Sequence, residues 1–180
     1  MESNQALERF LSGVERRALR MAGISTGSVD DALDIVQDAM MKLAGRYANR
    51  NESEWGGLFQ RILQNSITDW HRRHRVRNRW RVFFTRDDRE SEAADPMGSL
   101  ADPANPEPGK QLHEQDAMER LESAIHDLPL RQQQAFMLRL WEGLSVADTA
   151  RAMGCSQGSV KTHYSRAVNS LRRALEGYWP

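Results

Sequence analysis

The sequence contains one cysteine, Cys155, and no long run of apolar residues. A single thiol excludes an internal disulfide framework and any zinc site built from several cysteines. No stretch reaches the length of a membrane span, and the polar start of the chain lacks the apolar segment of a signal peptide. We therefore expect a cytoplasmic protein with no direct membrane insertion.

The sequence also lacks the alternation of apolar and polar residues that predicts a half-buried β-strand. Apolar residues instead recur every three or four positions, which is typical of amphipathic helices. Hydrophobic residues make up 39% of the 180 residues and the mean hydropathy is −0.69, so we expect small cores. The predicted class is all-α, with two small helical domains joined by a flexible, acidic, Pro-rich linker.

The formal net charge is zero, but the charges are segregated along the chain. Residues 69–89 carry eight arginines and three acids, whereas residues 90–119 carry eight acids and one lysine. A basic segment of this density attracts polyanions such as nucleic acid, even in a chain with no net charge.

The basic segment continues an apolar helix that begins at Trp55. Its apolar face has six residues at helical spacing: Trp55, Leu58, Phe59, Ile62, Leu63 and Ile67. Six arginines then follow on all sides of the helix: Arg72, Arg73, Arg75, Arg77, Arg79 and Arg81. Because Trp70 and Trp80 lie among them, the mixture suits a nucleic-acid strand whose bases can be unstacked. The alternative is a solvated, charged helix end.

Two amphipathic helices precede the basic helix and complete a first domain, residues 1–84. The first helix is expected to end near Ala22, before a break over residues 23–27. The second helix begins after the N-cap Ser28, and its polar face carries Asp31, Asp34, Gln37, Asp38 and Lys42. A polar loop is expected over residues 46–57.

Residues 85–113 hold four prolines among small and acidic residues, which predicts a flexible linker. Its acids could lie over a basic surface in the absence of nucleic acid, or the segment could be a plain solvated tether. Helix is expected to resume near Leu112.

The second domain, residues 114–180, ends in two helices joined by a tight turn at Gly154-Cys155-Ser156. Residues 145–148 form a variant of the capping box for the first of these helices. Such a pair is a helix-turn-helix, in which the first turns of the second helix enter the DNA major groove. The polar residues available there are Ser156, Gln157, Ser159, Lys161, Thr162, His163 and Arg166. An ordinary αα-hairpin would show the same apolar spacing, but the polar residues and the glycine turn favour DNA binding.

Three blocks of this sequence resemble RNA polymerase sigma factors of the extracytoplasmic-function (ECF) type, within the sigma-70 family. Residues 31–38, DALDIVQD, with Leu43, are similar to the helix that contacts the clamp helices of the polymerase largest subunit. Residues 55–73 resemble the helix that reads and opens the minus-ten element. Residues 128–171 resemble the domain that binds the minus-thirty-five element. The resemblance covers nearly the whole chain apart from the linker.

The resemblance implies a bacterial sigma factor that binds core polymerase, directs it to specific promoters and helps to melt the minus-ten element. Contacts with the polymerase, at its clamp helices and flap, would include the polar face of residues 31–42 named above. Contacts with the minus-ten element would fall on Asn65, Asp69, Arg72, Arg73, Arg75 and Arg77, with Asn65 placed to hydrogen-bond an extruded base. The helix-turn-helix residues would contact the minus-thirty-five element. An anti-sigma factor is a further expected partner.

No catalytic or metal-ligating constellation accompanies these blocks, since the five histidines are scattered. We expect no enzyme, no cofactor and no metal. A regulator of the LuxR type is one alternative, because residues 160–163 also resemble its helix-turn-helix, but it leaves the first domain unexplained. A sigma mimic that titrates an anti-sigma factor is another, but it would not need the arginine run.

Overall fold

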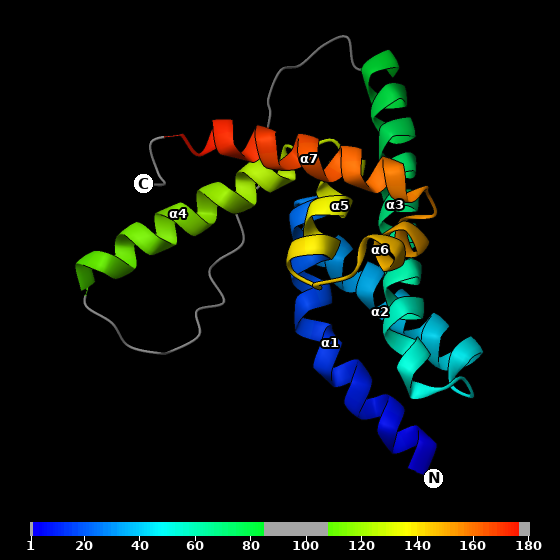
Figure 1. Ribbon diagram of the computed structural model, residues 1–180. Coiled ribbons are helices and arrows are strands. Elements are labelled where there is room, and N and C mark those ends of the chain that lie inside the picture. The colour runs from blue at the N-terminus through cyan, green and yellow to red at the C-terminus, as the bar shows by residue number, and fades with distance from the viewer. Residues whose placement is uncertain (1, 85–107, 177–180) are drawn as a thin grey trace. The chain divides into compact units, whose positions relative to one another are not determined.

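The structure is a computed structural model that describes residues 2–84 and 108–176, with side chains for residues 5–76 and 116–176. These residues form seven helices, α1 to α7, and no strand lies among them, which confirms the all-α class. The chain divides into two compact units, whose helices are labelled in Figure 1. The first contains α1, α2 and α3, and the second contains α4, α5, α7 and the start of α6. Most of the predicted linker, residues 85–107, lies outside the described residues.

In the first unit, α1 (Glu2–Thr26), α2 (Val29–Tyr47) and α3 (Glu52–Phe84) each pack against the other two. Its largest fully buried hydrophobic side chains are Met21, Leu43, Trp55, Phe59, Leu63 and Ile67. The ring centroid of Phe10 in α1 lies 5.8 Å from that of Trp55 and 6.3 Å from that of Phe59. Trp55 is 1% exposed, so the prediction that it belongs to the core is confirmed.

The end of α1 differs from the prediction. The helix continues through Gly23, where a break was expected, and ends at Thr26. Ile24 and Ser25 are buried, so packing against the unit outweighs the low helix propensity of glycine. The chain turns instead at Gly27, whose φ of +69° lies in the left-handed region that glycine adopts without strain.

The predicted caps at Ser28 and Ser145 are confirmed, and Ser156 caps α7 in the same way. Each Oγ accepts a hydrogen bond from the backbone N–H three residues later: Ser28 from Asp31 at 3.2 Å, Ser145 from Asp148 at 3.0 Å and Ser156 from Ser159 at 3.1 Å. These bonds satisfy backbone donors that the first turn of a helix leaves without a partner.

The loop predicted over residues 46–57 is wrong for most of its length. Because α2 runs to Tyr47 and α3 begins at Glu52, only residues 48–51 connect them. The indole Nε1 of Trp55 donates a hydrogen bond to the backbone oxygen of Tyr47 at 3.1 Å. This bond ties the first turn of α3 to the last turn of α2.

A capping box sets the start of α3. Oδ1 of Asn51 accepts a hydrogen bond from the N–H of Ser53 at 3.0 Å, and Oε2 of Glu54 accepts one from the N–H of Asn51 at 3.3 Å. Asparagine followed by glutamate three residues later is a sequence signal for a helix start. This signal, if applied, would have placed the start of α3 correctly.

The second unit contains α4 (Pro108–His126), α5 (Leu130–Leu140), α7 (Gln157–Ala174) and the start, as far as Ala150, of α6 (Val146–Met153). α7 packs against α5 and α4, and the buried residues of these helices include Ile125, Met137, Leu138, Val160, Ala167 and Leu171. α4 begins at Pro108 rather than near Leu112, because proline is well suited to the first position of a helix. The turn between α6 and α7 contains Gly154 at φ +63°, and the predicted helix-turn-helix is confirmed.

Replacing Asn51 with alanine removes the side chain that caps α3. We expect Asn51→Ala to lower the free energy of unfolding by about 1 kcal/mol, the typical contribution of an N-cap. Urea denaturation followed by circular dichroism measures this change. The exposed Asn49 is a matched control, since Asn49→Ala removes the same side chain without a cap. Equal losses in the two variants would contradict a specific role for the capping box.

Candidate functional site

The five polar residues predicted to contact polymerase lie along the outer side of α2. The inner side of this helix buries Ala32, Ile35, Val36, Ala39 and Leu43. Asp34, Gln37, Asp38 and Lys42 are therefore exposed, whereas Asp31 is half-buried at the start of the helix. Nζ of Lys42 lies 2.6 Å from Oδ2 of Asp38, and so partly screens one carboxylate. Asp34 and Asp38 still give this face an acidic character.

Exposed apolar side chains accompany these acids, and the sequence analysis missed their importance. Leu33 is 48% exposed and Met41 is 68% exposed, both on α2. Large apolar residues surrounded by polar ones are typical of protein–protein interfaces. The spacing of the residues would have indicated this for Met41. It follows Asp38 by three residues and Asp34 by seven, which places it on the same face of the helix.

The residues predicted to contact the minus-ten element continue along α3 beyond its buried half. Asn65, Asp69 and Arg72 follow one another at intervals of four and three residues, so they share one face of the helix, and all three are exposed. Arg61, also exposed, precedes Asn65 by one turn on this face and was missed by the sequence analysis. Arg73 and Arg75 are exposed on either side of it.

The side chain of Arg77 lies outside the described residues, as does that of Trp80. The predictions made for these two residues therefore rest on the sequence alone.

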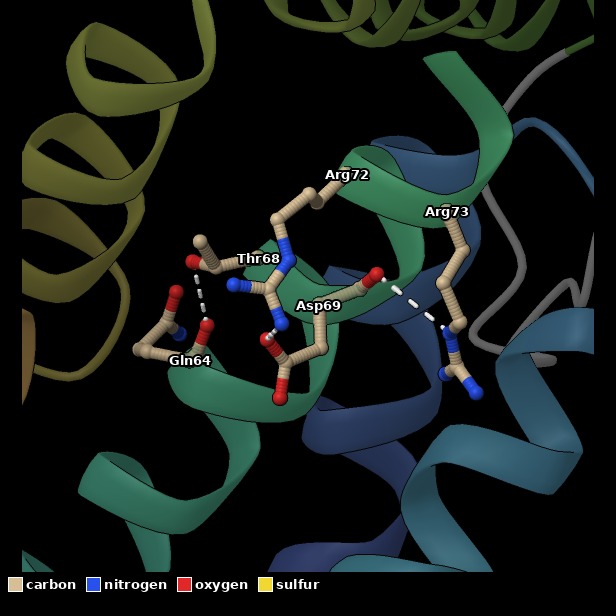
Figure 2. Close-up of polar contacts among 5 residues, drawn as sticks. All are labelled: Gln64, Thr68, Asp69, Arg72 and Arg73. Atoms are coloured by element: carbon tan, nitrogen blue, oxygen red, sulfur yellow. Dashed lines mark hydrogen bonds and ion pairs between the residues drawn. The ribbon is translucent and has the colours of Figure 1, made fainter. Parts of the chain in front are cut away.

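Figure 2 shows how Asp69 organises two of the arginines. Nη2 of Arg72 lies 3.2 Å from Oδ1 of Asp69, with the side chains 77% and 57% exposed. Nε of Arg73 donates a hydrogen bond to the backbone oxygen of Asp69 at 3.3 Å. Pairs as exposed as this contribute little stability. Their effect is to direct the guanidinium groups and to neutralise part of the positive charge.

Trp70 packs inside the first unit and is only 8% exposed. Its ring stacks on His74, with centroids 4.4 Å apart, and meets the ring of His71 edge-on at 4.9 Å. Nε2 of His71 in turn lies 3.1 Å from Oγ of Ser25 in α1. The sequence left the role of Trp70 open. In the structure it helps to hold the middle of α3 in place and is not available for stacking on a base.

The helix-turn-helix exposes part of the set predicted for the minus-thirty-five element. Gln157, Lys161, Thr162 and Arg166 are exposed, whereas Ser159 and His163 are half-buried. Ser156 is occupied by its capping role, and its Oγ also lies 2.9 Å from Oγ of Ser159. The predicted set therefore divides into exposed residues and residues that shape the turn.

Three further residues share the exposed side of α7. Ser165, Asn169 and Arg173 follow Thr162 at helical spacing and are exposed. They lie beyond the first turns of the helix, to which the sequence prediction was confined. α7 contains no acid along its whole length, which leaves this side of the helix uniformly basic and polar.

Among the residues whose side chains are described, no group of three or more His, Cys, Asp or Glu could hold a metal ion. Within the described part of the chain, every helix is too short or too polar to span a bilayer.

The fold and these surfaces define a helical, two-unit protein with a DNA-binding helix-turn-helix. A family model described as "Sigma-70, region 4" matches residues 118–171. The RNA polymerase sigma-E factor of Streptomyces antibioticus is 31% identical over 147 residues, which cover 81% of this chain and 71% of that protein. The ECF RNA polymerase sigma factor EcfG of Rhodopseudomonas palustris is 30% identical over 160 residues, which cover 88% and 79%.

A solved structure of the sigma factor RpoE in complex with the anti-sigma factor NepR, from Bartonella quintana, is also similar. Its TM-score is 0.60 at 28% identity, over 94% of this chain and 98% of that one. The chain belongs to the RNA polymerase sigma factors of the ECF type, and so to the proteins that direct polymerase to promoters. This confirms the resemblance seen in the sequence and contradicts the LuxR-type alternative.

Replacing Asp69 with asparagine removes the carboxylate that partly neutralises Arg72. We expect Asp69→Asn to bind a single-stranded oligonucleotide several-fold more tightly at low salt. The salt dependence should steepen by about 0.7, the contribution of one additional phosphate contact. Fluorescence anisotropy in a salt series measures both quantities.

Asp38→Asn is the matched control, since it makes the same change of charge on α2 and should leave binding nearly unchanged. Weaker binding by Asp69→Asn would show that the carboxylate serves binding by orienting Arg72, and would contradict the neutralising role.

Proposed function

We propose that the outer side of α2 docks on core RNA polymerase, at the clamp helices of its largest subunit. The observation that carries this proposal is the combination of Asp34 and Asp38 with exposed Leu33 and Met41 on one helix face. Carboxylates can steer the approach to a basic surface, and apolar side chains supply buried area once contact is made. The polymerase flap is proposed as a second contact, made by the second unit.

The exposed half of α3 is proposed to hold and melt the minus-ten element. Unstacking a base costs a few kcal/mol, which new contacts with the displaced strand must offset. Arg72, Arg73 and Arg75, continued by Arg77, supply contacts with phosphates, while Asn65 and Arg61 supply hydrogen bonds to an extruded base or its sugar. Because Trp70 is buried, this proposal does not assign it a stacking role.

The exposed side of α7 is proposed to read the minus-thirty-five element in the major groove. Lys161, Thr162 and Arg166 lie in the first half of this helix, where base edges come within reach. Gln157 and His163 flank them, while Ser156 and Ser159 hold the helix start. Ser165 and Asn169 extend the same surface, so that base contacts can continue beyond the first two turns.

We propose that the chain acts by binding and not by catalysis. We also propose that it acts in the cytoplasm, where polymerase and promoter meet. Membership of the sigma factor family supports both statements.

We also propose that an anti-sigma factor regulates this chain, as NepR is bound to the similar sigma factor of Bartonella quintana. We propose that residues 85–113 separate two functions. The part before them melts the promoter, and the part after them binds the upstream element.

Reversing charge on α2 tests polymerase docking. We expect a variant with Asp34→Arg and Asp38→Arg to lose co-elution with bacterial core polymerase in gel filtration, because like charges would then oppose the basic clamp surface. The control is Asp116→Arg with Glu119→Arg, which makes the same change of charge at exposed positions of α4. Loss of co-elution in the control as well would argue against a specific docking face.

Removing two arginines tests whether α2 and α3 have separate functions, polymerase binding and promoter opening. A variant with Arg72→Ala and Arg73→Ala should bind core polymerase normally but fail to form open complexes, because the displaced strand loses two cationic contacts. Permanganate reactivity of unpaired thymines reports promoter opening, and gel filtration reports polymerase binding. Arg72→Lys with Arg73→Lys should retain part of the activity, since it preserves charge. Simultaneous loss of opening and polymerase binding would contradict separate surfaces on α2 and α3.

A further inference from the structure

Arg139, in the last turn of α5, takes part in none of the proposed contacts with DNA or polymerase. It is half-buried, and its Nη1 donates a hydrogen bond to the backbone oxygen of Leu144, in the connection between α5 and α6. Its Cζ also lies over the ring of Tyr164 in α7, 5.9 Å from the ring centroid. One guanidinium group therefore contacts both the segment that leads into α6 and the side of α7.

The backbone of Leu144 is held by α5 at both of its polar groups. Its N–H donates a hydrogen bond to the oxygen of Leu138 at 3.0 Å, and its oxygen accepts the hydrogen bond from Arg139. The next residue, Ser145, caps α6 by accepting a hydrogen bond from the N–H of Asp148. Because a helix begins where its cap is placed, Arg139 helps to set the position of the first turn of α6.

The ring of Tyr164 packs α7 against α5. It stacks on the ring of Phe136, with centroids 6.3 Å apart and an interplanar angle of 18°, and Phe136 precedes Arg139 by one turn on the same face of α5. Thr162 and Arg166 lie two residues to either side of Tyr164. Since successive residues of a helix are rotated by about 100°, both lie on the opposite side of α7. A displacement of the ring would therefore tilt the surface proposed to read the minus-thirty-five element.

The two contacts of Arg139 use properties that arginine has and lysine lacks. A planar guanidinium group can stack on an aromatic face while its N–H groups donate hydrogen bonds in the plane. The distance to the ring of Tyr164 lies within the range of a cation–π interaction. An ammonium group has no such plane, so a lysine at this position would keep one of the two contacts.

We infer that Arg139 is a positioning residue that sets the angle of α7 behind its proposed DNA-reading surface, an inference that rests on the proposed function. It acts through Leu144 and Tyr164, which occupy its guanidinium group. A misaligned α7 keeps its charges and its phosphate contacts but no longer brings its side chains to the base edges. Loss of Arg139 should therefore reduce sequence discrimination more than overall affinity.

Arg139→Met tests this inference, because it removes the guanidinium group and keeps a long, unbranched side chain that suits a helix. A promoter is first selected from random duplex DNA by holoenzyme assembled from the wild-type chain and bacterial core polymerase. Filter binding then compares this promoter with the same DNA in which the minus-thirty-five element is replaced. The ratio of the two affinities should fall about tenfold in the variant, a loss of the size of one base contact. The slope of log affinity against log salt should stay unchanged, since no phosphate contact is lost.

Three further variants separate positioning from a general structural role. Arg139→Lys should give a ratio between those of the wild type and Arg139→Met, because it keeps one of the two contacts. Tyr164→Leu should also lower the ratio. The fall in the double variant, Arg139→Met with Tyr164→Leu, should be smaller than the product of the two single falls, because the two residues act through a shared contact. Melting temperature and co-elution with core polymerase are measured for all proteins.

An unchanged ratio in Arg139→Met would overturn the inference, even if the melting temperature falls. Equal weakening on both DNAs, with a slope shallower by about 0.9, would also overturn it and assign Arg139 to a phosphate contact. Independent falls in the double variant would contradict action through Tyr164. If Arg139→Met does not fold, Arg139→Lys decides, since a ratio equal to that of the wild type would overturn the inference. A wild-type holoenzyme that selects no promoter would contradict the proposed function itself, and this is seen before any variant is compared.

Discussion

The burial of the first half of α3 is the constraint on which the first unit depends. Trp55, Phe59, Leu63 and Ile67 pack between α1 and α2, and the same unbroken helix then carries Asn65, Asp69 and Arg72 on its outer side. Because an α-helix is stiff over a few turns, the packing of its buried residues fixes the direction of the exposed ones. The arginines are held by a hydrophobic core to which they contribute nothing.

Clustered positive charge is the common property of the surfaces assigned to DNA. α7 carries no acid, and the outer part of α3 carries one, at Asp69. Such clusters repel internally in the free protein, and the repulsion decreases when phosphates are nearby. The chain thus gives up some stability in exchange for affinity, as functional sites commonly do.

Much of the fold could be predicted because apolar periodicity and serine caps are local signals. The helices, their buried faces and the turn at Gly154 all follow from them. The start of α3 was also encoded locally, by Asn51 and Glu54, but was overlooked. The continuation of α1 through Gly23 could not be predicted in this way, since it depends on the burial of Ile24 and Ser25 by other helices. For the same reason, the burial of Trp70 becomes apparent only when the helices are packed together, whereas helical phase already places Met41 beside Asp34 and Asp38.

The four-residue connection between α2 and α3 has a consequence for the entropy of complex formation. The hydrogen bond from Trp55 joins the start of α3 to the last turn of α2, and the capping box at Asn51 fixes where α3 begins. A partner that immobilises α2 thereby also fixes the orientation of α3. The rotational freedom lost by the first contact does not have to be lost again by the second. Two surfaces on one rigid body can therefore act in sequence, with the first binding event preorganising the second.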